Sequence, residues 1–107
     1  MNASAAAALV KAAMDGVPQI KGQLFSPNGG RCAMGVLWDA GLALRGRAGL
    51  DHEVAGCPEC GATTQMWNAG DPINTERDLV VHLNNDHGWG FLDIASKLGP
   101  DASGSGA

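Results

Sequence analysis

Two cysteines set two residues apart are the part of this sequence best suited to chemistry. Cys57 and Cys60 lie in the segment CPECG at 57–61, with proline between them and glycine directly after the second. A C-x2-C segment can turn tightly enough to direct both sulfurs at one ion, and the glycine frees the backbone to make that turn. Because thiolate and imidazole ligands suit zinc, the segment predicts half of a zinc site.

Two histidines near the end of the chain can supply the other half. With His82 and His87 the pattern becomes C-x2-C-x21-H-x4-H, and its outer spacings are those of a structural zinc site. Five residues along a regular helix place two side chains about 140° apart, so this pair converges only if the last helical turn loosens. Four protein ligands would complete a tetrahedron and leave no position for water. We therefore expect a structural ion.

Other assignments of these residues stay open. His52 or Cys32 could replace one of the histidines as a ligand, although Cys32 is more simply a small buried residue at the start of a helix. His82 could lie on the protein surface, and His87 could be a cation favoured by a helix C-terminus. Glu53 follows His52 shortly before CPECG, which is a partial match to a zinc deaminase pattern. A small metalloenzyme is therefore retained as a third hypothesis.

The size of the chain makes a stabilising metal useful. Its 107 residues are enough for one domain, and much of the 45% hydrophobic fraction is alanine, so the core is small. Small cores are often supplemented by a metal or by disulfides. We expect one zinc-stabilised domain over 1–99 and a flexible C-terminal tail over 100–107.

The apolar pattern predicts a small α+β domain with about four short helices and one or two short strands. The helices are expected over 5–16 after the cap Ser4, 31–44, 76–88 and 90–98. Strands are expected over 20–25 and 62–67. Thr75 begins the third helix in a capping box with Asp78. The predicted buried faces are Met34, Leu37, Trp38, Gly41 and Leu44 in the second helix, Leu79, Val80 and Leu83 in the third, and Phe91, Ile94, Ala95 and Leu98 in the fourth.

The charge pattern bears on partners and location. The formal net charge of −4 argues against a general nucleic-acid binder, which usually has a basic face. Arg45 and Arg47, with Arg31 nearby, are the candidate residues for binding a partner. The first residues lack the basic start of a signal peptide, and no apolar run is long enough to span a membrane. The sequence therefore predicts a cytoplasmic protein, or a component of a particle assembled inside the cell.

Two segments resemble known proteins. CAMGVL at 32–37 and VVHLNNDHGWGFLDIASKL at 80–98 resemble segments of small bacterial and phage proteins that carry C-A-L-G-A-L-like and H-L-N-D-x-H-x-W sequences. That group has no assigned activity, so the resemblance implies no function. It offers a second interpretation of HLNNDHGW as a junction between two helices. In this interpretation Asn84, Asn85 and Asp86 cap and tie the turn, and Trp89 fills the core.

Together these features favour a non-enzymatic zinc-binding protein-interaction module, an accessory or assembly subunit whose partner is another protein or a larger assembly. The alternative is a zinc-stabilised nucleic-acid-binding or regulatory protein, which would bind DNA or RNA with a steep dependence on salt.

Overall fold

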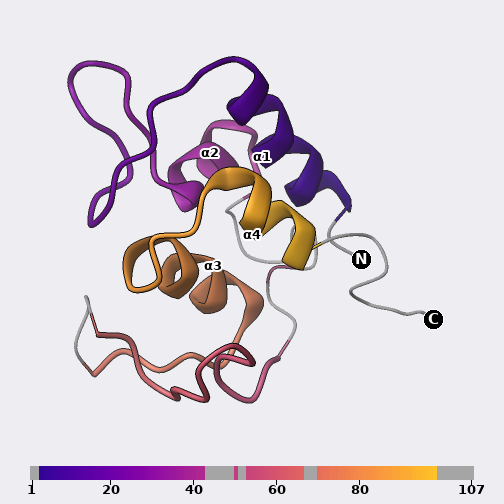
Figure 1. The fold of residues 1–107 in the computed structure, drawn as a ribbon, viewed down its shortest axis with the longest axis vertical. Coiled ribbons are helices and arrows are strands. Elements are labelled where there is room, and N and C mark those ends of the chain that lie inside the picture. Colours follow the sequence, from indigo (N-terminus) through magenta and orange to yellow (C-terminus); the bar gives the residue numbers. More distant parts are fainter. Residues whose placement is uncertain (1–2, 43–49, 51–52, 67–69, 99–107) are drawn as a thin grey trace.

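Four short helices form the framework of the protein (Figure 1). The structure, a computed structural model, describes residues 3–42, 50, 53–66 and 70–98. The helices are α1 (Ala3–Met14), α2 (Ala33–Asp39), α3 (Glu76–Asn85) and α4 (Phe91–Lys97). The four predicted helices are thus confirmed, with α2 and α3 shorter than expected. The predicted tail over 100–107 lies outside the described residues.

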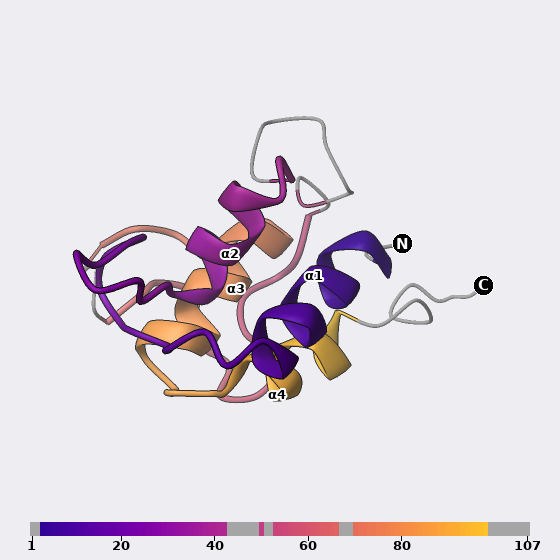
Figure 2. The ribbon, with the colours of Figure 1, turned by 90° about the horizontal axis from the view of Figure 1, so that it is seen from above.

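The helices enclose one small core. α1 lies beside α4, α2 packs against α1 and α3, and α3 also contacts α4 (Figures 1 and 2). Each helix contributes a side chain with no exposed surface, namely Leu9, Leu37, Leu83 and Ile94. Burying one such side chain contributes about 1.5–3 kcal/mol, so this layer is a large part of what holds the helices together.

The second helix differs from its prediction in length and in its buried face. α2 ends at Asp39 because Gly41 adopts a left-handed φ of 75°. The Gly41 and Leu42 N–H groups then turn back to the Trp38 and Leu37 carbonyls, a common helix ending. Gly41 therefore terminates the helix instead of joining its buried face. Trp38 is 50% exposed, which corrects its predicted place in the core, and Leu44 lies outside the described residues.

The β component is smaller than predicted. Among the described residues, extended pairing is limited to isolated bridges, and the α+β class is not confirmed. The expected strand over 20–25 contributes one bridge, from Phe25 to Arg31, which also bridges Gln19. The chain enters α2 two residues after Arg31, so this pairing has no room to extend into a ladder. The described part of the strand expected over 62–67, residues 62–66, likewise contributes a single bridge, between Thr64 and Pro72.

The start of α1 and the start of α3 show how local sequence sets helix ends. α1 begins at Ala3, one residue before the predicted cap Ser4. α3 begins as predicted, because Thr75 accepts the Asp78 N–H and the Asp78 carboxylate accepts the Thr75 N–H at 3.0 Å. The predicted inner faces of α3 and α4 are buried, as expected. This end of α3 is therefore firmly placed, and the opposite end carries the candidate site.

Candidate metal centre

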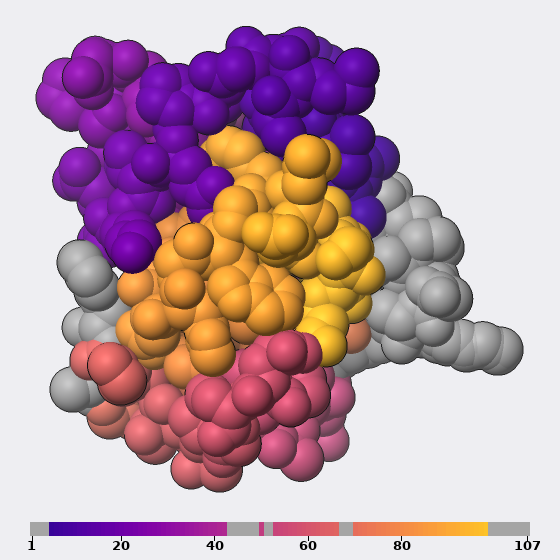
Figure 3. All heavy atoms as spheres, in the orientation of Figure 1, coloured from indigo at the N-terminus to yellow at the C-terminus, as the bar shows by residue number. Residues whose placement is uncertain are grey.

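Two cysteines and two histidines meet at the C-terminal end of α3. The segment 53–66 lies against α3 and α4 on one side of the molecule (Figures 1 and 3). Cys57, Cys60, His82 and His87 each direct one donor atom to a common point, and these four atoms lie within 4.8 Å of one another. The structure therefore brings together the four residues chosen from the sequence, although 21 residues separate the two pairs.

The spacing of the donor atoms fits a tetrahedral ion. The Sγ atom of Cys60 lies 3.4 Å from Nε2 of His82, and Sγ of Cys57 lies 3.7 Å from Nε2 of His87. A tetrahedral zinc with bonds of about 2.3 Å to sulfur and about 2.0 Å to nitrogen would hold sulfur and nitrogen about 3.5 Å apart. The two observed distances lie on either side of this value. The cluster is thus able to accept a metal once its more widely spaced donor atoms, which lie up to 4.8 Å apart, move closer together.

The cysteine half of the centre is a tight knuckle. The Gly61 N–H donates to the Cys57 carbonyl at 2.7 Å, and the Cys57 N–H donates to the Ala62 carbonyl at 2.8 Å. Gly61 has a φ of 76°, a conformation that glycine adopts without strain. Backbone N–H groups of Glu59 and Cys60 point at the Cys57 sulfur, an arrangement that favours a thiolate. The knuckle therefore places both sulfurs, and its N–H groups offset part of the cost of burying a Cys57 thiolate.

The histidine half depends on how α3 ends. After Asn85 the helix opens, and the N–H groups of Asp86 and His87 both donate to the His82 carbonyl, at 2.8 and 3.2 Å. The His87 bond spans five residues and widens the last turn. The imidazole rings of His82 and His87 then lie 4.8 Å apart and nearly perpendicular, at 88°. The loosened turn expected from the spacing is confirmed.

The buried carboxylate of Asp86 contacts one of the two histidines, His82. Asp86 Oδ2 lies 2.6 Å from His82 Nδ1, and the Asp86 and His82 side chains are each only 3% exposed. With Nδ1 facing the carboxylate, Nε2 is the nitrogen turned toward the sulfurs, the usual order in carboxylate–histidine–metal sites. Sequence reasoning placed Asp86 only in a turn. Its i, i+4 spacing from His82 on one helix was the signal that could have revealed this contact.

The four residues of the cluster differ in their exposure to solvent. Cys57 and His82 are buried, His87 is half-buried, and Cys60 is exposed. Glu59, within the knuckle, forms an ion pair with Lys97 of α4. The centre thus links the knuckle, α3 and α4, with one sulfur open to solvent.

The other residues chosen from the sequence lie elsewhere. Cys32 is buried at the start of α2, where its sulfur accepts the Gly35 N–H at 3.4 Å, so it caps a helix and is not part of the cluster. His52, Arg45 and Arg47 lie outside the described residues. Arg31 is paired with Asp39 at 2.8 Å, and its guanidinium lies 4.5 Å from the centre of the Phe25 ring.

The interpretation of HLNNDHGW as a junction is compatible with the metal centre. Asn84 is 1% exposed, and its Oδ1 accepts the Ala33 N–H at 2.9 Å and a Gln19 amide N–H at 2.7 Å. Its Nδ2 donates to the Ile20 carbonyl at 2.9 Å. Trp89 is half-buried against the core. The same segment therefore ties the turn on one side and presents two histidines on the other.

The two thiols differ in acidity. The hydrogen bond to His82, followed by the Ala62 N–H, lowers the pKa of Cys60 to about 6. Burial raises the pKa of Cys57 above its ordinary value, and this effect outweighs the nearby N–H groups. At pH 7.5 the metal-free folded protein therefore holds Cys60 as a thiolate and Cys57 as a thiol. Binding a metal must displace the Cys57 proton.

The difference in pKa between Cys57 and Cys60 predicts how many thiol protons are released when zinc binds. We expect about one thiol proton per zinc at pH 7.5, with affinity falling about tenfold for each pH unit of acidification towards pH 6.5. An unfolded chain with two ordinary thiols would release nearly two. Titration calorimetry in buffers with different ionisation heats measures the total proton release, and the thiolate absorbance of the metal-free protein gives the share that comes from the two thiols. A value near two would contradict a preformed cluster.

Comparison of the chain with protein-family models, with curated proteins and with solved structures yields no match.

No helix in the described part of the chain has the length and apolar character needed to cross a membrane.

Proposed function

We propose that this protein is a small zinc-stabilised, non-enzymatic module that binds another protein. The observation that carries the proposal is the convergence of two sulfurs and two imidazole nitrogens within 4.8 Å. This donor set suits zinc better than magnesium or calcium, which prefer oxygen ligands. Four protein ligands would fill the tetrahedron, which supports a structural ion over a catalytic one that must bind water.

The position of the centre supports a stabilising role. The ion would join the knuckle to the end of α3, and the Glu59–Lys97 ion pair joins the knuckle to α4. Apart from Cys57, the knuckle segment contributes little to the core, so few other contacts hold it in place. Because the site is assembled only in the folded chain, metal-binding energy adds directly to folding energy. Free cysteines of this kind stay reduced in the cytoplasm, which is the compartment we propose.

Elemental analysis combined with chelation tests the metal. We expect about one zinc per chain and a fall in Tm of more than about 10 °C on chelation, reversed by zinc but not by magnesium. Chelation that leaves Tm unchanged would contradict a structural ion.

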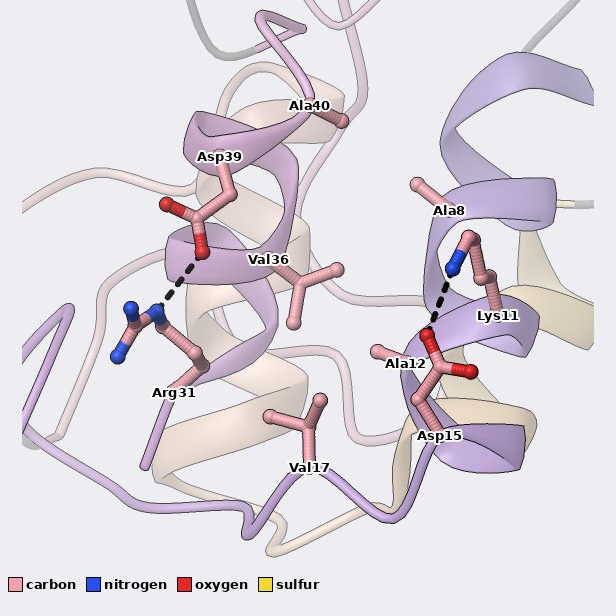
Figure 4. Close-up of a pocket in the computed structure, with 9 residues that line it drawn as sticks. All are labelled: Ala8, Lys11, Ala12, Asp15, Val17, Arg31, Val36, Asp39 and Ala40. Carbon is pink, nitrogen blue, oxygen red and sulfur yellow. Dashed lines mark hydrogen bonds and ion pairs between the residues drawn. The ribbon is translucent and has the colours of Figure 1, made fainter. Parts of the chain in front are cut away.

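A groove between α1 and α2 supports the interaction role (Figure 4). It encloses about 390 Å³ and has an apolar floor formed by Ala8, Ala12, Val17, Val36 and Ala40. Ion pairs line both rims, Lys11 with Asp15 at 2.7 Å and Arg31 with Asp39 at 2.8 Å. Trp38 is half-exposed on α2. An apolar floor with a charged rim is the common arrangement of a protein-binding surface.

Two variants that differ by one position along α1 test the groove. We expect Ala8→Glu to remove the partners that the zinc-loaded wild-type protein captures from a lysate, because it places a charge on the apolar floor. Ala7→Glu is the matched control, since Ala7 is exposed and does not line the groove. Both variants should keep the wild-type zinc content and Tm. Equal capture by the two variants would show that the partner binds elsewhere.

A further inference from the structure

We propose that Asp86 is a positioning residue of the metal centre, and that it couples the bound ion to the surface segment 64–66. One carboxylate oxygen, Oδ2, faces Nδ1 of His82 at 2.6 Å and accepts the Met66 N–H at 2.7 Å. The inference rests on the proposed zinc site and adds a regulatory consequence. When the centre holds its metal, the backbone at Met66 is held as well.

The first step concerns His82. A histidine whose Nδ1 donates to a carboxylate must keep its proton on that nitrogen, which leaves the Nε2 lone pair free for a metal. Nε2 of His82 lies 3.4 Å from the Cys60 sulfur, within the cluster. Asp86 therefore selects the form of His82 that binds metal and fixes the plane of its ring.

The second step concerns burial. The Asp86 side chain is 3% exposed, and a buried carboxylate needs strong hydrogen-bond donors to offset its lost hydration. A metal on Nε2 would polarise the opposite N–H of His82 and strengthen its bond to Oδ2. Occupation of the centre thus stabilises Asp86 in the position where it also meets Met66.

The third step concerns the segment that Asp86 holds. Backbone bonds close its base, from Ile73 N–H to the Thr63 carbonyl at 2.9 Å and from Gln65 N–H to the Asp71 carbonyl at 2.9 Å. Beyond Gln65 the next described contact is the bond from Met66 N–H to Asp86. The Met66 side chain is 77% exposed, so the element coupled to the metal belongs to the protein surface. Because of this coupling, the conformation of the surface segment 64–66 depends on whether metal is bound.

Nuclear magnetic resonance of the full zinc-loaded chain tests the coupling directly. In the wild-type protein we expect a protonated Nδ1 and a metal-bound Nε2 on His82. In the Asp86→Asn variant we expect the Nδ1 proton signal to shift or disappear, and zinc affinity to fall about 10- to 100-fold in competition with a chelator. The Met66 amide should exchange about tenfold faster in this variant, whereas the Gln65 amide should not change.

Asp78→Asn is the matched control. It removes the same charge from the opposite end of α3 and weakens the capping box without touching the cluster. It should lower Tm but leave the His82 signals and the Met66 amide at their wild-type values. If Asp86→Asn and Asp78→Asn have equal zinc affinity and Met66 exchange, the inference is wrong while the zinc site stands.

Two outcomes can be measured on the wild-type protein, so they do not depend on whether a variant folds. A wild-type protein that binds zinc through Nδ1 of His82 would overturn the inference alone. A wild-type protein that takes up no zinc would overturn the proposed function together with it.

Discussion

Replacement of Cys57 by serine is expected to remove the metal and most of the stability of the protein. The Cys57 side chain is only 2% exposed, and its sulfur is one of four donor atoms that meet at the centre. A serine hydroxyl is a poor zinc ligand, so the ion would lose a quarter of its ligands in a domain with a small core. We expect the free energy of unfolding to fall by at least about 3 kcal/mol, equivalent to about 12–24 °C in Tm. Calorimetric melting and elemental analysis of the purified variant measure both effects.

Cys32→Ser is the matched control for this experiment. Cys32 is also buried, but it caps α2 through the Gly35 N–H and lies outside the cluster. Serine is among the preferred residues at a helix N-terminus, so this exchange should cost less than about 1 kcal/mol. The variant should retain one zinc per chain. Equal melting temperatures for Cys57→Ser and Cys32→Ser would mean that no metal stabilises the fold.

Truncation of Asn84 to alanine is expected to have the second largest effect. Asn84 is 1% exposed and joins α3 to the start of α2 and to the chain after α1, through Ala33, Ile20 and Gln19. The substitution leaves the Ala33 N–H and the Ile20 carbonyl without their side-chain partner and opens a cavity between them. Such buried groups cost about 1–3 kcal/mol each, so we expect a loss of about 3–5 kcal/mol in urea unfolding of the zinc-loaded protein.

The same substitution at an exposed asparagine is the matched control. It shows how much stability is lost when an asparagine side chain outside the Asn84 hydrogen-bond network is removed. Asn28 is exposed, and within the described part of the chain its Oδ1 accepts a local bond from Ser26 at 2.7 Å. Asn28→Ala should change stability by less than about 0.5 kcal/mol. A loss below about 1 kcal/mol for Asn84→Ala would indicate that the helices hold their arrangement without this side chain.

The proton count and the Asn84 truncation examine the two halves of the candidate centre. Zinc-linked proton release reports whether Cys57 and Cys60 already form a knuckle before the metal arrives. The Asn84 variant reports whether the segment that carries His82 and His87 is held from its other side. If both results agree with expectation, the metal binds to a largely prepared centre instead of creating one.

Several features of the protein follow from sequence alone because their interactions are local. The capping box of Thr75 and Asp78 spans three residues, and the inner faces of α3 and α4 follow from helical spacing. The four donor residues could also be chosen, because few residue types bind zinc and their spacing within each pair is restrictive. The need for a loosened turn between His82 and His87 followed from helix geometry.

Other features were decided only when distant segments met. Asp86 is close in sequence to His82, but its bond to Met66 joins residues 20 positions apart, and the Asn84 bond to Ala33 joins residues 51 apart. No local pattern encodes which backbone group a side chain will find at that distance. Trp38 was misplaced for the same reason, since helical spacing identifies a face but not whether another segment covers it. The sequence by itself therefore determined the helices and the four candidate ligands, while tertiary packing decided the contact between Asp86 and His82, the bonds that tie the turn and the absence of a sheet in the described residues.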